Sequence, residues 1–223
     1  HKYLRKSHGD FSSYLGASPH SVKVGIYRDV LLDVPGPSWI EDVWVRPEVS
    51  GDFRKAQVRV QVETSGQDAS VDWMLTDPLG KRINSGTGRI SNGLFNQQID
   101  VEAPRLWWPR THGTPNLYEL EIILKRGKET LDTRSVRFGI RDIKPVLTDS
   151  QTGEKRFRFD INGQPVFLRG ACWAPLEGMT HCWRQERAMR LLDLFEQGQM
   201  NVLRIWGEGH VPPREFYDEC DRR

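Results

Sequence analysis

Apolar and polar residues alternate with a period of two along most of the stretch from residue 39 to residue 138. The clearest case is Ala56–Val62, where every second residue is apolar and the residues between are polar or charged. This pattern is typical of a β-strand with one buried face. Similar runs predict further strands at Trp39–Val45, Val71–Thr76, Gly88–Val101, Leu117–Leu124 and Thr130–Phe138. Roughly six or seven short strands with regular turns indicate an immunoglobulin-like β-sandwich.

Turn sequences divide these runs and set the domain limits. Pro35-Gly36-Pro37 is a strong break ahead of the first strand, and Lys125–Lys128 has the composition of a hairpin turn. We therefore expect the sandwich to occupy residues 34–142. Residues 1–33 carry a short patterned piece that could not bury a core alone, as expected for the end of another β domain.

The period changes beyond residue 142. Asp142–Lys155 is polar and is predicted to be a loop. Trp183–Gln197 has apolar residues at helical spacing and is followed by Gly198, and Pro212-Pro213 precedes a second amphipathic stretch. Two apolar runs that read as strands flank the first helix, at Val166–Leu168 and Val202–Trp206. Residues 143–223 therefore predict the first βαβα portion of a TIM (β/α)8 barrel, in which chemistry lies at the carboxyl ends of the strands. The predicted fold class is mainly β.

Composition and charge bear on whether the chain binds nucleic acid or enters a membrane. The chain has 223 residues, a net charge of +2, and acidic residues interleaved with the basic ones, so no nucleic-acid partner is indicated. No apolar run reaches the length that spans a membrane. No signal peptide is visible, but the chain starts at His1 rather than Met, so a leader could have been removed. The compartment stays open, with a periplasmic or secreted location favoured.

The three cysteines do not form a disulfide framework. They are Cys172, Cys182 and Cys220, an odd number confined to the last quarter of the chain. Cys172 and Cys182 together with His181 invite a metal site, but the spacing matches no common zinc signature. We therefore expect unpaired thiols and no metal site.

Several motifs together resemble glycoside hydrolase family 2. The sandwich segments are Leu106–Pro109, Gly113, Leu117–Leu120 and Phe138–Arg141, and the barrel segments are Asn162-Gly163, Gly170–Pro175, Asn201–Gly209 and Phe216–Asp221. The Trp206-Gly207 pair after Arg204 is most similar to the β-mannosidase and exo-β-glucosaminidase branch. Residues 1–33 resemble the end of the jelly-roll sugar-binding domain. The resemblance covers most of the chain.

The resemblance implies a retaining exo-β-glycosidase that removes terminal β-linked mannose, glucosamine or a related sugar and needs no cofactor. Two glutamates, about 5–5.5 Å apart, act as acid/base and nucleophile in such enzymes. In the family they follow the fourth and seventh barrel strands, neither of which we expect in this chain. No catalytic residue is therefore assigned, and the chain alone is expected to be inactive.

Five residues are candidates for sugar contact. By resemblance, Arg204 orients the nucleophile carboxylate and helps to hold the sugar, and the alternative is an internal ion pair. Trp173 and Trp206 follow their strands, where an aromatic ring either stacks on a sugar or serves the core. Glu177 and Glu208 are candidate sugar ligands, and for Glu208 the alternative is a solvated loop carboxylate. The resemblance argues against the hypothesis that Glu177 and Glu208 are themselves the catalytic pair.

Three positions depart from the family pattern. Cys172 stands where relatives usually have Asn, and Glu177 stands where they often have Asp. The segment around Asp10 lacks the tryptophans of the β-mannosidase branch, which leaves Asp10 a weak candidate. These departures leave the sugar open.

Two other readings remain. The chain could be a non-catalytic carbohydrate-binding or protein-interaction module, or an inactive relative of the glycosidases. Because the barrel strands would lack their neighbours, we also expect self-association through residues 157–223, or poor order there.

Overall fold

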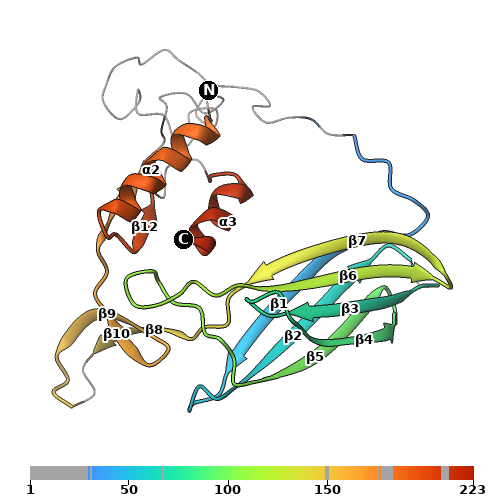
Figure 1. Ribbon diagram of the computed structural model, residues 1–223, viewed down its shortest axis with the longest axis horizontal. Coiled ribbons are helices and arrows are strands. Elements are labelled where there is room, and N and C mark those ends of the chain that lie inside the picture. The colour runs from blue at the N-terminus through green and yellow to red at the C-terminus, as the bar shows by residue number, and fades with distance from the viewer. Residues whose placement is uncertain are drawn as a thin grey trace, which may run out of the picture. The chain divides into compact units, whose positions relative to one another are not determined.

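A computed structural model describes residues 30, 32–66, 68–148, 151–174, 176, 183–206 and 211–223. Residues 33–167 form one compact unit (Figure 1). Residues 168–221 belong to a second unit. None of the helices in the described part of the chain is long and apolar enough to cross a membrane.

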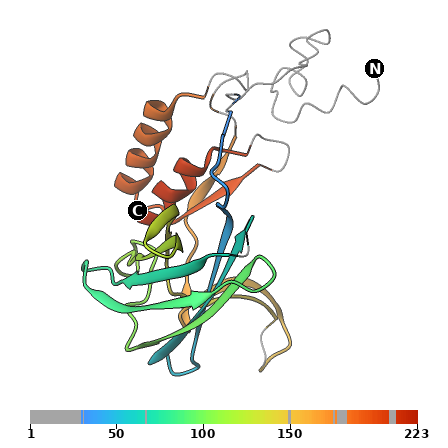
Figure 2. The same cartoon turned by 90° about the vertical axis from the view of Figure 1, so that its right-hand side faces the viewer.

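The first unit is built on a sandwich of two antiparallel sheets (Figures 1 and 2). One sheet has the order β1-β2-β5, and the other has the order β4-β3-β6-β7. The strands are β1 (Ile40–Val49), β2 (Lys55–Thr64), β3 (Ser70–Thr76), β4 (Arg82–Arg89), β5 (Leu94–Glu102), β6 (Tyr118–Arg126) and β7 (Glu129–Phe138). The mainly β fold and the sandwich predicted from the alternation are confirmed.

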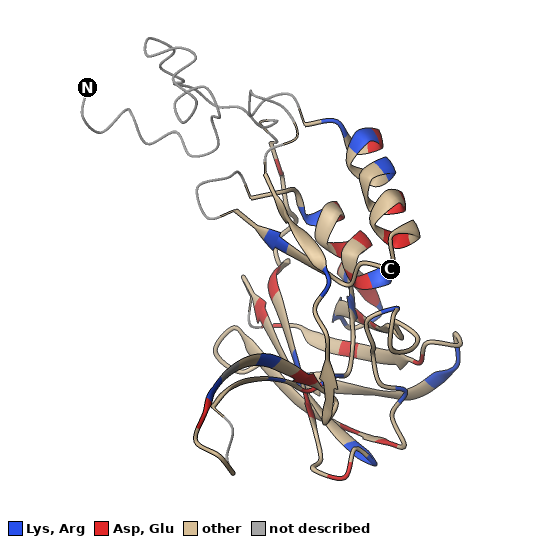
Figure 3. Cartoon of the chain, turned by 90° about the vertical axis from the view of Figure 1, so that its left-hand side faces the viewer, with Lys and Arg blue, Asp and Glu red and all other residues tan. Residues whose placement is uncertain are grey.

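The core lies between the two sheets because each strand turns its alternate apolar residues inward. In β2 the burial alternates along the strand, so that Val58 and Val62 are fully buried while Arg59 is exposed. Leu75 of β3 and Ile122 of β6 come from the opposite sheet and are also fully buried. Acidic and basic residues are interspersed along the strands (Figure 3). The sandwich therefore has a closed apolar core of its own.

The prediction of one strand over Gly88–Val101 is wrong. β4 ends at Arg89, β5 begins at Leu94, and Ser91 and Leu94 close a turn between them. The turn residues Asn92 and Gly93 have φ values of 52° and 76°. Positive φ at both central positions is what a tight hairpin turn with the right twist requires.

The prediction of a loop over Asp142–Lys155 is also wrong in part. β8 (Ile143–Thr148) pairs with β9 (Lys155–Ile161), which pairs in turn with β10 (Gln164–Val166) in an antiparallel three-stranded sheet. Of the apolar run expected as the first barrel strand, only Val166 lies in a strand, and that strand is antiparallel to its neighbour.

The Trp107 motif joins the sandwich to this sheet. The backbone N–H of Trp107 donates to the carbonyl of Ile140, and the guanidinium of Arg141 lies 4.4 Å from the centre of the Trp107 ring. Asn162, in the turn between β9 and β10, donates from Nδ2 to the Trp107 carbonyl over 2.9 Å. The motif therefore has a structural role within residues 33–167.

The second unit has the order strand, helix, strand, helix. β11 (Gly170–Trp173) and β12 (Val202–Ile205) pair in parallel, α2 (Gln185–Gln197) connects them, and α3 (Arg214–Arg222) follows. Both predicted helices are confirmed, including the end of α2 at Gly198. Figure 3 shows charged residues along α2, as expected for an amphipathic surface helix.

Candidate functional site

The β11–β12 pair has two chemically different faces. The register sets Cys172 beside Arg204 and Trp173 beside Ile205. Side chains of neighbouring residues in a strand point to opposite faces, and residues paired in register share a face. One face therefore carries Cys172 and Arg204, and the other carries Trp173 and Ile205.

The face with Trp173 is covered by the helices. Trp173 is 6% exposed, and its ring centre lies 4.6 Å from that of Phe216 in α3. Ala188 and Leu192 of α2 complete this small core, with Ile205 packed against it. Of the two roles weighed for Trp173, this placement supports the core role, since the buried ring offers little surface to a sugar.

The opposite face of the strand pair carries two exposed polar side chains, Arg204 and Cys172. Arg204 and Cys172 are both exposed, and Nη1 of Arg204 donates a hydrogen bond to Sγ of Cys172 over 3.3 Å. Within the described residues, Arg204 has no carboxylate within ion-pair distance. Its remaining N–H groups are therefore available to an acceptor, and a guanidinium fork suits a carboxylate. The alternative of an internal ion pair finds no partner in the described part of the chain.

Trp206 continues β12 by one residue. Its backbone N–H donates to the carbonyl of Trp173 over 3.0 Å, so the parallel pairing extends to this position. Strand alternation assigns Trp206 to the face of Arg204, and the residue is half-buried. Arg204 and Trp206 are thus the two predicted site residues that the strand pair brings together.

Contacts at the amino ends of the strands hold this register. The Asn201 side chain accepts from the backbone N–H of Arg169 over 2.9 Å, and the Asn201 N–H donates to the Arg169 carbonyl over 2.8 Å. The Arg169 guanidinium also donates from Nε to the carbonyl of Gln199 over 2.8 Å. We did not predict these residues as part of the site, although a polar Asn directly before an apolar strand was a usable signal.

Other candidates lie outside the described residues. These are Glu177, Glu208, Asp10, His181 and Cys182. Among the residues that the structure does describe, no three His, Cys, Asp or Glu side chains gather as a metal site would require. Cys172 and Cys220 are free thiols, and burial raises the pKa of the Cys220 thiol to about 11, with the nearby Asp221 and Glu219 adding to the effect.

Two open cavities lie on the sandwich. One, of about 310 Å³, is lined mainly by polar and charged residues that include Arg89, Lys125 and Arg126. The other, of about 400 Å³, includes Glu48, Lys55 and Glu102. Neither is lined by an aromatic ring on which a sugar could stack.

Known proteins resemble this chain along most of its length. The family described as Glycosyl hydrolases family 2 matches residues 39–141. β-Mannosidase B of Neosartorya fischeri is 32% identical over 206 residues, which is 91% of this chain and 24% of that protein. β-Mannosidase B of Emericella nidulans is 31% identical with the same coverage. The chain therefore spans about a quarter of the length of the curated relatives it matches.

Solved structures of glycosidases are also similar to this chain. The β-D-mannosidase from Dictyoglomus thermophilum superposes with a TM-score of 0.74 at 28% identity, over 85% of this chain and 24% of that one. The exo-chitosanase of Amycolatopsis orientalis gives a TM-score of 0.68 at 25% identity, over 89% of this chain and 23% of that one. Both likenesses extend well beyond the sandwich, since they cover more residues than the family match at 39–141.

Proposed function

Because this chain belongs to glycoside hydrolase family 2, we propose that it forms part of a retaining exo-β-glycosidase that removes terminal β-linked sugars of the mannose or glucosamine type. The relatives support this, since their names are those of β-mannosidases and an exo-chitosanase. The observation that carries the proposal is the exposed guanidinium of Arg204 near the carboxyl end of β12, with Sγ of Cys172 as its hydrogen-bond partner.

The proposal assigns a role to each segment. Residues 1–33 end a jelly-roll domain, residues 34–142 form the sandwich, and residues 143–223 begin the catalytic barrel. In a parallel barrel the carboxyl ends of the strands surround the active site. β11 and β12 are parallel and adjacent, which suits the first two barrel strands.

The chemistry follows from where charge develops. A retaining glycosidase needs a carboxylate nucleophile held in line with the anomeric carbon, and an acid/base carboxyl about 5–5.5 Å away. Arg204 orients the nucleophile through paired N–H donors, and its charge keeps that carboxylate ionised. Trp206 forms a wall of the sugar site, while Glu177 and Glu208 reach sugar hydroxyls. The two catalytic glutamates lie on later strands, so the 223-residue chain alone is inactive.

Unpaired strand edges have a further consequence. β11 and β12 form a two-stranded sheet in the described part of the chain, and exposed edges promote association. We expect the isolated chain to form dimers or larger species at micromolar concentrations in sedimentation velocity. A monodisperse monomer with ordered residues 168–223 would argue against a barrel portion.

The direct test is an assay of the longer protein that contains this chain. A panel of nitrophenyl β-glycosides would include the mannoside, glucosaminide, galactoside and glucuronide. We expect turnover of the mannoside or glucosaminide, and a loss of about a thousandfold or more in kcat when Arg204 is changed to Met, with Arg190→Met as the charge-matched control. No turnover on any sugar, together with glycan binding by the sandwich, would favour the binding-module alternative.

A further inference from the structure

The pairing of Cys172 with Arg204 assigns a function to a residue that departs from the family pattern. The two residues are direct neighbours in the parallel register and share the open face. Sγ of Cys172 lies 3.3 Å from Nη1 of Arg204 and is the one polar partner of that guanidinium among the residues the structure describes. The position of the guanidinium is therefore tied to the thiol.

An arginine side chain needs such a tie in order to act as a fixed donor. It has four rotatable bonds, and free rotation about them spreads the guanidinium over many positions. A donor that must meet a carboxylate in one geometry has to be held by its surroundings. Because the Sγ contact uses Nη1, the N–H groups on Nε and Nη2 remain free to form a fork.

We propose that Cys172 is a positioning residue that accepts a hydrogen bond from Arg204 and so fixes the direction in which the arginine presents its remaining donors. The inference rests on the proposed function for the catalytic consequence, but the contact itself belongs to this chain.

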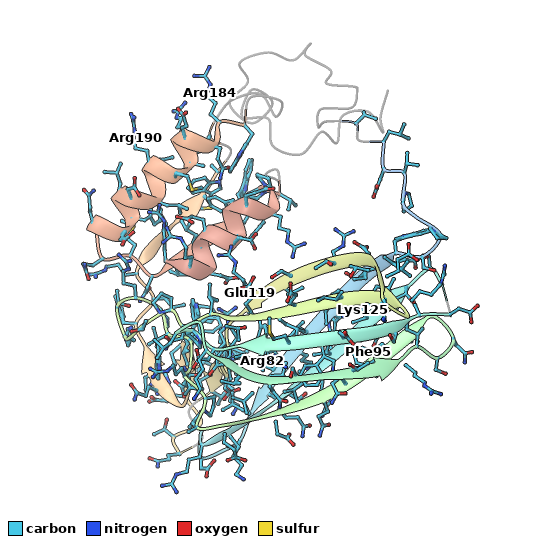
Figure 4. All side chains as sticks on the ribbon, turned by 45° about the vertical axis from the view of Figure 1, so that its right-hand side comes forward. Arg82, Phe95, Glu119, Lys125, Arg184 and Arg190 are labelled. Carbon is cyan, nitrogen blue, oxygen red and sulfur yellow. The ribbon has the colours of Figure 1, made fainter. Side chains whose placement is uncertain are left out.

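The contact can be tested without any glycosidase activity. The rate of Cys172 alkylation by iodoacetamide at pH 7.5 would be measured on the 223-residue chain, resolved by peptide mass spectrometry. Arg204→Met is expected to lower this rate about threefold to tenfold, since it removes the cationic donor that contacts Sγ of Cys172. Arg190→Met removes the same charge from α2, where the side chain points away from the helix (Figure 4), and is expected to leave the rate unchanged.

Cys220 provides an internal reference in the same digest. Its thiol is half-buried with a pKa raised to about 11 by burial, so it should alkylate slowly in all three proteins. If a substitution loosened the fold in general, Cys220 would react faster, and this change would identify the loosening. An unchanged or faster rate at Cys172 in Arg204→Met, with Cys220 unaffected, would overturn the contact.

The catalytic consequence is tested in the longer protein. Cys172→Ala removes the acceptor and is expected to lower kcat about tenfold while KM changes by less than about twofold, because the misdirected arginine affects the reacting carboxylate. Cys172→Ser retains an acceptor and should recover most of the loss. Equal activity of both variants and the parent would overturn the positioning role. Absence of turnover in the parent would defeat the proposed function, while the alkylation result would still decide the contact.

Discussion

A single buried side chain, that of Asn162, connects three parts of the first unit. Its Oδ1 accepts from the backbone N–H of Asp142 and its Nδ2 donates to the carbonyl of Trp107, both over 2.9 Å. Asn162 is 5% exposed and has a φ of 48°, in the left-handed region that Asn tolerates better than most residues. The sequence pair Asn162-Gly163 signals the turn, but the two side-chain contacts could not be predicted without the fold.

Replacement of Asn162 by Ala should therefore lower the free energy of unfolding by more than the strain of a positive φ alone would. We expect a loss of about 3 kcal/mol in the free energy of unfolding, since two partly buried backbone groups lose their partners. Asn92→Ala is the matched control, because Asn92 has a φ of 52° in an exposed turn and no hydrogen bond from its side chain. It should cost about 1 kcal/mol. Equal losses in urea denaturation would show that the contacts of Asn162 contribute nothing.

Asp72 gives the sandwich a dependence on pH. Its carboxylate accepts from Lys125 Nζ over 2.5 Å and from Thr87 Oγ1 over 2.6 Å, across three neighbouring strands. Figure 4 labels Lys125 on β6. The hydrogen bond from Lys125, followed by that from Thr87, lowers the pKa of Asp72 below its usual value near 3.8. A carboxyl with a lowered pKa in the folded state stabilises the fold above its unfolded pKa and loses that effect as the pH falls.

Asp72→Asn should accordingly destabilise the chain at pH 7, and the loss of stability should be smaller at pH 3, below the usual pKa of an Asp carboxyl. The expected difference is about 0.5 to 1 kcal/mol, a modest value because the pair is partly exposed to solvent. Asp68→Asn serves as the control, since Arg126 contacts the backbone carbonyl of Asp68 rather than its side chain. Urea denaturation at the two pH values measures the effect. A cost that persists unchanged at pH 3 would contradict the electrostatic explanation.

At the scale of elements, the sequence predicted the strands that bury one face, and it missed β8 and the separate strand β4, which bury no residue. β2, β3 and β6 alternate because every second residue enters the core. β4 and β8 lie at the edges of their sheets, and none of their residues is fully buried. Their sequences are therefore free of the alternating pattern, and backbone pairing with the neighbouring strand determines them instead. Arg204 and Cys172 could likewise be named from sequence motifs, but their contact could be predicted only from the register of β11 and β12.

A substitution at Gly170 would test how closely the parallel strands β11 and β12 approach each other. A Cβ at this position would collide with the backbone carbonyl of Val202, so Gly170→Ala should force β11 and β12 apart. We expect faster hydrogen exchange in β12 and a loss of about 2 to 3 kcal/mol in the stability of residues 168–223. Gly51→Ala is the control, since nothing lies within 4 Å of its added Cβ. Unchanged exchange in Gly170→Ala would mean that the strands are not paired as described.

At the scale of the whole molecule, the two units have very unequal cores. The sandwich buries residues from all seven of its strands except β4, including Leu75, Leu120 and Ile122. Among the described residues, the core of the second unit consists of Trp173, Ala188, Leu192 and Phe216. Small units bury a smaller fraction of their apolar surface and are less stable. Sequence length and composition alone could not reveal this inequality, because both units have ordinary amphipathic patterns.

We therefore expect the two units to unfold in separate steps, residues 168–223 first. Peptide-resolved hydrogen exchange against urea would follow α2 and α3 in one step and β1–β7 in another. Phe216→Ala, which removes a fully buried ring, should cost about 3 to 5 kcal/mol and leave α2 and α3 unprotected while the sandwich keeps its midpoint. Leu120→Ala is the reciprocal variant and should shift the sandwich step alone. If either substitution moves both steps together, the units share one cooperative transition, and the small core of the second unit would have to draw stability from the first.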